Sequence, residues 1–449
     1  MPQDPARHAK NPIRWFFSNL GPGVITGAAD DDPSGIATYS TAGALLGTGL
    51  LWTALITWPL MASVQMMCAR IGMVTGRGLA GAFHHKLPKL LITIFAAALL
   101  LANTINIGAD LSGMADAAQM VFGFNSHLLV ALFGLAITLA TVFFRYHSIA
   151  SILKWLALTL FAYVITAFVI GPDWRAVAHD TFVPSLPKGH AAWATMVAIL
   201  GTTISPYLFF WQASQEIEEQ KAAGRRLVAR RGATRHELGV REMDVGVGTL
   251  FSNLVMYFII LTTALTLHRH GITNIETTRQ AAEALIPFAG KFAALLFTLG
   301  VLGVGFLAIP TLAGSAAYAC AETFGWHQGL DAKFKSARAF YGIVIFSTII
   351  GMALDFARIS PVKALFYTAV INGLLAPFSA RRRSLDRYRS ENHAQSAELT
   401  FERDLCLPGD FVNVRSGNWN VRVLNMPLKP GSVATTSISF TFCYSAENR

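Results

Sequence analysis

Three consecutive acids, Asp30, Asp31 and Asp32, lie inside an otherwise apolar stretch that reads GPGVITGAADDDPSGIATYSTAGALLG. An ionised carboxylate at the centre of a bilayer costs at least a few kcal/mol on insertion scales, so three in a row need a wet cavity, a bound cation or protonation. Pro33 lacks a backbone donor and disfavours helix at the residue before it. We therefore expect a helix that stops near Asp31, unwinds, and begins again near Ile36.

A second weak point lies in the apolar stretch WATMVAILGTTISPYLFFWQASQEIEE, where Pro206 again follows a small polar residue, Ser205. A half-helix that ends inside a membrane leaves backbone carbonyls unpaired, and its negative dipole end favours a cation. Asp32 adds a formal charge at the first break, while Thr202 and its neighbours add carbonyls at the second. The two breaks together predict an oxygen-lined cation site, which anionic substrates would fit poorly. The structural alternative is a pair of proline kinks with acids at the membrane surface.

The composition fits a chain whose main solvent is lipid. Of 449 residues, 53% are hydrophobic and only 14% are charged, and the mean hydropathy is +0.45. A soluble domain carries about 25% charged residues, so disordered chains, fibrous repeats and ordinary cytosolic enzymes are excluded. Stretches long enough to cross a bilayer lie near residues 19–47, 49–73, 89–112, 126–146, 148–171, 191–215, 244–267, 289–322, 337–355 and 359–379. The fold class predicted is an all-α polytopic membrane protein.

Basic residues predict the orientation of these crossings. If the N-terminus is cytoplasmic, nineteen Lys and Arg fall in inner segments and seven in outer ones, as the positive-inside rule requires. The basic run at 221–241 then counts as a solvated inner loop, and nucleic-acid binding is the poorer interpretation of the net charge of +10. We expect an integral protein of the plasma membrane, the inner membrane if the source is a bacterium.

Three regions follow from this pattern. We expect a cytoplasmic N-terminus over residues 1–18, a ten-helix transporter domain over 19–379, and a polar C-terminal tail of unknown structure over 380–449. Within the tail, VNVRSGNWNVRVL and SVATTSISFTF have the composition of short strands. A broken helix opens each group of five crossings, about 19–171 and 191–379, which is the best sequence indicator of an inverted-repeat transporter site.

Polar residues elsewhere in the apolar stretches have two interpretations. Asn103, Asn106 and Asp110 are spaced to share one helix face, where they either line an aqueous path or hydrogen-bond to a neighbouring helix. Gln212, which follows the second break, is expected to face an inner vestibule, and Glu216 to lie at the cytoplasmic surface.

The motifs DDDPSG and TTISPY resemble the paired motifs of the NRAMP divalent-metal transporters, Asp-Pro-Gly-Asn in the first span and Ala-x-x-Met-Pro-His in the sixth. The resemblance extends to QMMCARIGMVTGRGLA, NIGADLSG and LGVGFLAIPTLAGSAAYACAETF, and it covers about residues 15–378 without the tail. It implies a LeuT-like fold of two inverted repeats of five transmembrane helices, with the first and sixth helices broken.

The resemblance also implies a set of metal-site residues. Asp32 matches the family's coordinating Asp, and Thr202 matches the residue whose backbone carbonyl binds metal. Gly35 stands where the family has a coordinating Asn, and Ser205 stands where it has a thioether Met.

Further positions belong to the implied pathway or to the surroundings of the site. Tyr207 replaces the His that follows the sixth-span Pro, and Asn372 lies near a tenth-span Gln position that can contact the ion. Asp110 matches an Asp of the third span, whereas Gly113 replaces a Glu linked to proton transfer. Asp31 remains available to a proton relay.

These departures change the expected ion. A soft Met ligand helps to select transition metals over Mg²⁺ and Ca²⁺, and without it the remaining ligands are all oxygen, which suits Mg²⁺ with retained water. The pattern resembles the NRAMP-related magnesium transporter branch and predicts uptake of Mg²⁺ or Mn²⁺ by alternating access with weak or no proton coupling. The cation is the substrate, and we expect no cofactor, no nucleic acid and no obligate protein partner besides the lipid bilayer.

Three alternatives remain open. One is a proton-coupled Mn²⁺ or Fe²⁺ importer, as in most of the family, and the second is a sodium-coupled symporter of an organic solute on the same fold. The third, a membrane enzyme, lacks support because the sequence offers no convergent acid–base or nucleophile set.

Overall fold

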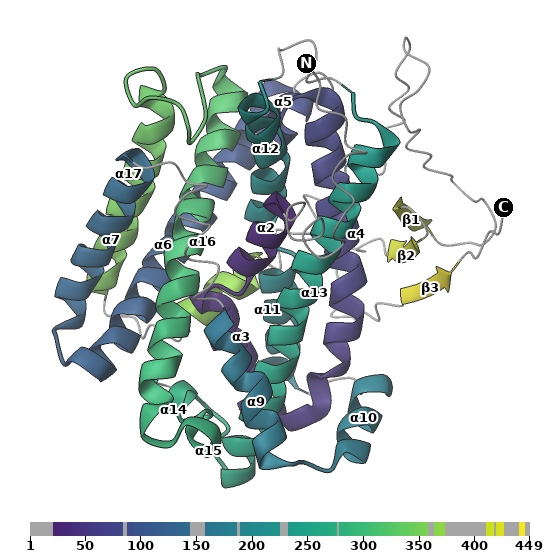
Figure 1. Ribbon diagram of the computed structural model, residues 1–449, viewed down its shortest axis with the longest axis vertical. Coiled ribbons are helices and arrows are strands. Elements are labelled where there is room, and N and C mark those ends of the chain that lie inside the picture. The colour runs from purple at the N-terminus through teal and green to yellow at the C-terminus, as the bar shows by residue number, and fades with distance from the viewer. Residues whose placement is uncertain are drawn as a thin grey trace, which may run out of the picture.

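The computed structural model describes residues 21–83, 88–143, 158–185, 189–224, 232–275, 278–357 and 363–372, together with three strands between residues 410 and 444. Helices make up almost all of the part before the strands (Figure 1). The expected N-terminal segment 1–18 and much of the tail lie outside the described residues, as do residues 148–157 of the fifth predicted crossing.

The first crossing is broken where the sequence predicts it. Helix α2 (Pro22–Asp30) ends before the acids are complete, and α3 begins at Pro33 and runs to Leu46. Between them Asp32 is extended, with φ −60° and ψ 170°, as a residue before proline prefers. Helix α3 begins three residues earlier than expected because proline is well tolerated in a first turn, where no backbone N–H is needed.

The sixth crossing repeats this construction. Helix α11 (His190–Thr203) and helix α12 (Pro206–Ala222) are separated by Ile204 and by Ser205, which is extended with φ −73° and ψ 128°. Pro206 is the first residue of α12, so each of the two prolines ends one helix and starts the next. The two predicted breaks are confirmed.

The remaining helices are α4 (Trp52–Thr75), α5 (Leu79–Phe83), α6 (Lys89–Phe122), α7 (Ser126–Phe143), α9 (Phe161–Ile170), α10 (Trp174–Phe182), α13 (Arg235–Thr266), α14 (Thr278–Glu283), α15 (Ile286–Ala289), α16 (Ala293–Phe324), α17 (Arg338–Leu354) and a helix over 363–372. The longer of the remaining helices overlap the predicted crossings with shifted ends, and the short helices α5, α10, α14 and α15 lie between crossings. By length and composition six helical segments of the described chain can cross a membrane, and two shorter apolar helices accompany them.

Helix α13 shows why helix ends are hard to place by hydropathy. The apolar pattern begins near residue 244, but the helix begins at Arg235, where Thr234 and Glu237 form a reciprocal capping box. The cap extends the helix through residues that the sequence analysis assigned to a solvated loop.

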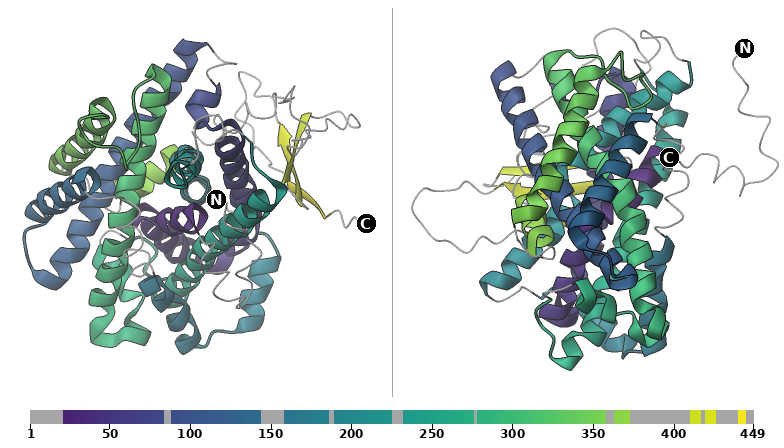
Figure 2. Two further views of the ribbon diagram at one scale, coloured as in Figure 1. Left: turned by 45° about the horizontal axis from the view of Figure 1, so that its top comes forward. Right: turned by 90° about the vertical axis from the view of Figure 1, so that its left-hand side faces the viewer.

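The broken helices lie at the centre of the bundle. Figure 1 shows α2 and α3 in the middle, with α6 and α16 on one side and α13 and α4 on the other. The left-hand view in Figure 2, tilted by 45°, shows them surrounded by other helices. Helix α2 packs directly on the backbone of α13, since a Cβ at Gly27 would lie 2.2 Å from the carbonyl oxygen of Gly248. The peripheral helix α7 leaves apolar side chains such as Leu132 and Leu139 exposed, as a lipid-facing helix does.

The C-terminal region contains a small antiparallel sheet of β1 (Asp410–Ser416), β2 (Trp419–Asn425) and β3 (Phe440–Tyr444), in the order β1-β2-β3. Strands β1 and β2 confirm the strand composition seen in residues 412–424, whereas residues 432–439 of the second predicted segment lie outside the described residues.

Candidate metal site

Asp32 lies at the break between α2 and α3, where its carboxylate meets donors from three helices. It is 3% exposed. Its Oδ1 accepts a hydrogen bond of 2.7 Å from the backbone N–H of Gly35. Its Oδ2 lies 3.3 Å from both Nδ2 of Asn106 and the hydroxyl of Tyr207. Donors from α3, α6 and α12 therefore fix this carboxylate in one orientation.

The two breaks meet at this point. The Tyr207 hydroxyl, from the first turn of α12, lies 3.3 Å from the carbonyl oxygen of Ala29 at the end of α2. On the α3 side, the hydroxyls of Thr202 and Tyr39 are 3.1 Å apart. Contacts between the broken helices thus occur on both sides of Asp32.

At the second break, backbone carbonyl oxygens lie at the end of α11. Ser205 Oγ lies 2.7 Å from the carbonyl oxygens of both Gly201 and Thr202. A carbonyl oxygen has two lone pairs, so the Thr202 carbonyl can accept from Ser205 and still bind a cation. A hydroxyl occupies the position where a thioether would supply a soft ligand.

Gly35 enters the site through its backbone alone. A Cβ built there would lie 3.2 Å from Cε2 of Tyr39 and 3.6 Å from Oδ1 of Asp32. A side chain at this position would therefore sit beside the Asp32 carboxylate, in a space that the Tyr39 ring and the Asp30 carbonyl oxygen border closely.

The side chains of Asp30 and Asp31 contact a different helix, α13. Both are buried, and Ser252 Oγ of α13 lies 2.6 Å from Oδ2 of Asp30 and 3.2 Å from Oδ1 of Asp31. The contacts of these two acids thus run to α13, whereas Asp32 alone of the three contacts the second broken helix. A pathway role for Asp31 stays a prediction.

The polar residues predicted to share one face of helix α6 have different partners in the structure, some on a neighbouring helix and some at the first break. Asn103 packs against α16, where its Nδ2 lies 2.8 Å from the Leu312 carbonyl and from Ser315 Oγ. Asn106, one turn further on, reaches Asp32 instead. Asp110 is fully buried, has no side-chain hydrogen-bond partner in the described residues, and faces the backbone of Ser34 at the first break.

The helix over 363–372 approaches the same break. Ser34 Oγ donates a hydrogen bond of 3.0 Å to the carbonyl of Leu365. Asn372 is also buried, but it lies seven residues beyond Leu365, or about 10 Å along the helix. No contact of the described residues joins Asn372 to Asp32, so its expected role also stays a prediction.

The carboxylates do not converge as a group. In the described part of the chain, no three His, Cys, Asp or Glu side chains are arranged to hold one metal ion. A cation beside Asp32 would therefore meet fewer than three such side chains in this part of the chain, and neutral oxygens would have to complete its coordination.

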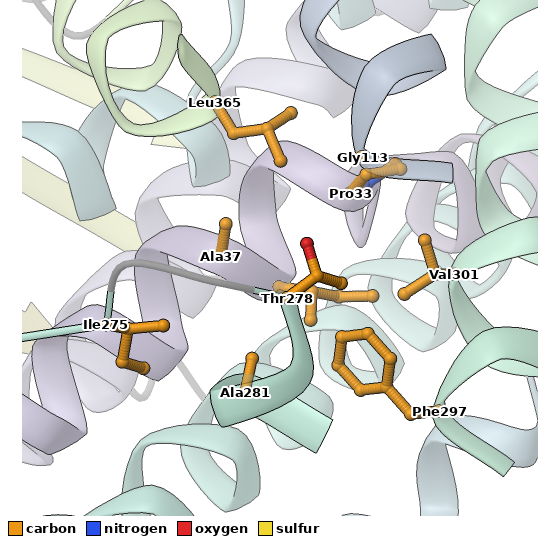
Figure 3. Close-up of a pocket in the computed structure, with 10 residues that line it drawn as sticks. Pro33, Ala37, Gly113, Ile275, Thr278, Ala281, Phe297, Val301 and Leu365 are labelled. Carbon is orange, nitrogen blue, oxygen red and sulfur yellow. The ribbon is translucent and has the colours of Figure 1, made fainter. Parts of the chain in front are cut away.

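A small apolar pocket adjoins the first break (Figure 3). It is lined by Pro33, Ile36, Ala37, Gly113, Ile275, Thr278, Ala281, Phe297, Val301 and Leu365. A Cβ at Gly113 would lie 3.0 Å from Cδ1 of Leu365, so leucine occupies the space beside this position. No lining side chain can titrate.

The other end of α2 is held by a charged cluster that the sequence analysis placed wrongly. We expected Glu216 at the cytoplasmic surface and Arg241 in a solvated loop, but they are 1% and 8% exposed. Arg241 Nε lies 2.9 Å from Glu216 Oε1, and Nη1 lies 2.6 Å from Asp244 Oδ2. Arg241 also pairs with Glu219, so one guanidinium serves three carboxylates.

Asp244 connects this cluster to α2. Its carboxylate accepts hydrogen bonds of 2.8 Å from the backbone N–H groups of Gly21 and Gly23, where α2 has no side-chain cap of its own. Gln212 adds a second link, because its Oε1 lies 2.7 Å from Thr26 Oγ1 and its Nε2 donates to Glu216 over 2.8 Å. Residues far apart in sequence thus substitute for a local helix cap.

Sequence reasoning did not identify Tyr39, Ser252 or the charged cluster as part of this arrangement. Tyr39 and Ser252 carried no distinguishing signal in an apolar stretch. The charged residues carried one, since Arg241 and Asp244 are spaced i and i+3 on one helix with Glu216 preceding them, but a basic run nearby favoured the loop interpretation.

Comparisons with known proteins point to one family. The sequence profile of the family described as natural resistance-associated macrophage protein-like, Nramp, matches residues 23–381. The "Divalent metal cation transporter MntH" of Yersinia pestis is 26% identical over 315 residues, which cover 68% of this chain and 74% of that one. The protein of the same name from Caldanaerobacter subterraneus is 25% identical over 425 residues, covering 90% and 93%.

A solved structure shares the fold. The manganese transporter of Eremococcus coleocola, as its H236A mutant, superposes with a TM-score of 0.58 at 16% identity, covering 86% of this chain and 91% of that one.

Proposed function

This chain belongs to the Nramp family and has its LeuT-like fold, and from that premise we propose that it imports a hard divalent cation, Mg²⁺ first, through the site between its two broken helices. At the level of the family it is a divalent metal transporter of the membrane, and the metal is its substrate. The observation that carries the proposal is the contact of both breaks with one carboxylate, since Tyr207 of α12 lies 3.3 Å from Asp32 Oδ2.

The preference for Mg²⁺ rests on the chemistry of the ligands. Asp32, the Thr202 carbonyl and Ser205 offer oxygen only, and Gly35 has no side chain that could replace a water ligand. Mg²⁺ favours oxygen ligands and sheds its water reluctantly, so it gains most from a site that lets water remain. Mn²⁺ also accepts carboxylate, carbonyl and water ligands, so these ligands discriminate less strongly against Mn²⁺ than against softer metal ions.

Mn²⁺ is the second candidate, and the relatives favour it. The solved neighbour is called a manganese transporter, and the curated relatives are called divalent metal cation transporters. Their names describe those proteins, whereas the exchange of a thioether for Ser205 is a property of this chain, and for that reason Mg²⁺ stands first. An organic-solute symporter has no such support from the relatives.

We propose further that transport is driven by the membrane potential without a coupled proton. The surroundings of Gly113 support this, because the neighbouring pocket is lined by apolar side chains and by Thr278 alone among polar ones. A relay needs titratable groups in sequence. A divalent cation that enters at −100 mV gains about 4.6 kcal/mol, at roughly 2.3 per charge. The cytoplasmic position of the N-terminus and the bacterial inner membrane belong to the same proposal.

Proteoliposomes containing the purified protein test this function. Uptake of Mg²⁺ and of Mn²⁺ is measured side by side under an inside-negative potential, with a pH-sensitive dye in the lumen. We expect Mg²⁺ uptake that Mn²⁺ inhibits and no acidification of the lumen beyond that of empty vesicles. Mn²⁺ uptake at micromolar concentrations that millimolar Mg²⁺ leaves unchanged would favour the second candidate, and metal-dependent acidification would show proton coupling.

Restoring the family's ligands should shift the selectivity. We expect Ser205→Met combined with Gly35→Asn to raise the ratio of Mn²⁺ to Mg²⁺ transport about tenfold, since a soft thioether and a side-chain amide replace retained water. The Tyr39 ring has to move by a few tenths of an ångström, because a Cβ at Gly35 would lie 3.2 Å from it.

The two single variants are the controls for this prediction. Ser205→Met supplies the sulfur and should account for most of the shift, whereas Gly35→Asn alone should change the ratio little. If the double variant keeps the selectivity of the wild type, the ligands at these two positions do not set the choice of ion.

A further inference from the structure

The unbroken helix α6 places Asn106 beside the break in the first crossing. Asn106 is 1% exposed, and its Nδ2 lies 3.3 Å from Asp32 Oδ2. Its Oδ1 has no hydrogen-bond partner among the described residues. A buried amide oxygen is normally paired, so an unpaired one beside a cation site requires an explanation.

A second asparagine on the same helix face has different partners for its amide nitrogen. Asn103 lies one turn earlier on α6 and is equally buried. Its amide nitrogen lies 2.8 Å from a carbonyl and from a hydroxyl of α16, which are contacts between packed helices. Asn106 instead directs its amide to the carboxylate at the break, so two similar residues have different surroundings.

The hydrogen bonds to Asp32 limit how a cation can bind to it. Gly35, Asn106 and Tyr207 each direct a donor to this carboxylate. A carboxylate has about four lone-pair positions, so roughly one remains for a metal ion. A divalent cation at Asp32 therefore keeps water molecules as ligands, or draws its other ligands from neutral oxygens.

Water bound to a divalent cation is a strong donor and needs acceptors around it. The Asn106 Oδ1 is such an acceptor, because it belongs to the residue that already contacts Asp32 and has no other partner among the described residues. It lies on α6, which runs without a break from Lys89 to Phe122 and so forms a fixed wall of the site. Asp110, one turn further on, adds a carboxylate to the same wall.

We propose that Asn106 is a positioning and specificity-determining residue: its amide nitrogen orients Asp32, and its amide oxygen accepts a hydrogen bond from a water molecule of the bound cation. The inference rests on the proposed cation site at Asp32. It predicts that the side chain of Asn106 favours ions which keep their water, and thus Mg²⁺ over Mn²⁺, because Mg²⁺ gives up its hydration shell less readily.

The experiment compares Asn106→Leu with Asn103→Leu, which makes the same chemical change one turn away. The full-length variants are reconstituted, and KM and maximal rate are measured for Mg²⁺ and for Mn²⁺. For Asn106→Leu we expect the ratio of the Mg²⁺ KM to the Mn²⁺ KM to rise about tenfold, as the loss of one hydrogen bond to a cation-bound water predicts. Asn103→Leu should lower thermal stability and leave this ratio within about twofold of the wild type.

Two more variants separate the functions of the amide and guard against misfolding. Asn106→Asp keeps an oxygen acceptor at the same place, so it should keep the KM ratio near that of the wild type even though the donor to Asp32 is lost. Asn106→Ala removes donor and acceptor with little demand on packing, and it should reproduce the ratio of Asn106→Leu if the leucine variant does not fold.

The outcomes distinguish this inference from the proposed function. Wild-type protein that takes up neither cation would overturn the proposed function and the inference together. Wild-type transport with an unchanged KM ratio in folded Asn106→Leu or Asn106→Ala overturns the inference alone. An equal change of the ratio in Asn103→Leu also overturns it, because the effect would then come from helix packing.

Discussion

Asp32→Asn is expected to reduce cation uptake by at least about a hundredfold, since the loss of a buried charged partner costs several kcal/mol of binding. Asparagine is as good an N-cap residue as aspartate, so the hydrogen bond from the Gly35 N–H at the start of α3 is retained. The variant therefore removes the charge while it preserves the break between α2 and α3. Uptake is measured in proteoliposomes and folding by the elution profile in detergent after heating.

A matched control exists on the short helix α10. Asp173 is also an N-cap aspartate, and its carboxylate accepts from the backbone N–H of Arg175 over 3.0 Å, but it is exposed and lies outside the site. Asp173→Asn should transport at the rate of the wild type. Uptake by Asp32→Asn within a fewfold of the wild type would remove Asp32 from the site, and with it the proposed function.

Arg241→Met is expected to destabilise the protein by about 3 to 5 kcal/mol, the usual cost of removing one partner from a buried ionic cluster. Arg241 is the shared partner of Glu216, Glu219 and Asp244. Without it, Glu216 and Asp244 are left as buried carboxylates without their cation, and the link from Asp244 to the start of α2 weakens. The measurement is the midpoint of thermal unfolding in detergent.

The control and the rescue both lie close to the cluster. Arg235 is exposed in the first turn of the same helix, so Arg235→Met should shift the midpoint by at most about a degree or two. Adding Glu216→Gln to Arg241→Met should recover part of the lost stability, because one buried charge fewer is left unpaired. If Arg241→Met melts like the wild type, the cluster does not hold α2 in place.

The local features of the fold were predictable because their causes are local. A proline denies its predecessor helical geometry and needs no N–H in a first turn, so Pro33 and Pro206 placed both breaks without information from the rest of the chain. The apolar stretches placed the crossings for a similar reason, since each must be long enough by itself to span a bilayer. The family resemblance added residue roles at the breaks, of which the proximity of Tyr207 and Asp32 is the clearest geometric counterpart.

Helix packing decided the remaining features. The spacing of Asn103 and Asn106 places both on one helix face, yet Asn103 contacts α16 and Asn106 contacts Asp32. Likewise, a basic residue near a loop can be solvated or buried, and Arg241 is buried because the carboxylates of α12 and α13 come together around it.

The physical reason for this division is the range of the forces involved. Backbone geometry and hydrophobic length act within a few residues, so the amino-acid order alone determined the broken crossings and the all-helical membrane fold. The environment of a polar side chain depends on which helix lies opposite, because a buried donor or acceptor must find its partner wherever the chain returns. Only the tertiary structure could show that Asp32 is held by three helices and that Asp244 caps a helix more than two hundred residues earlier in the chain.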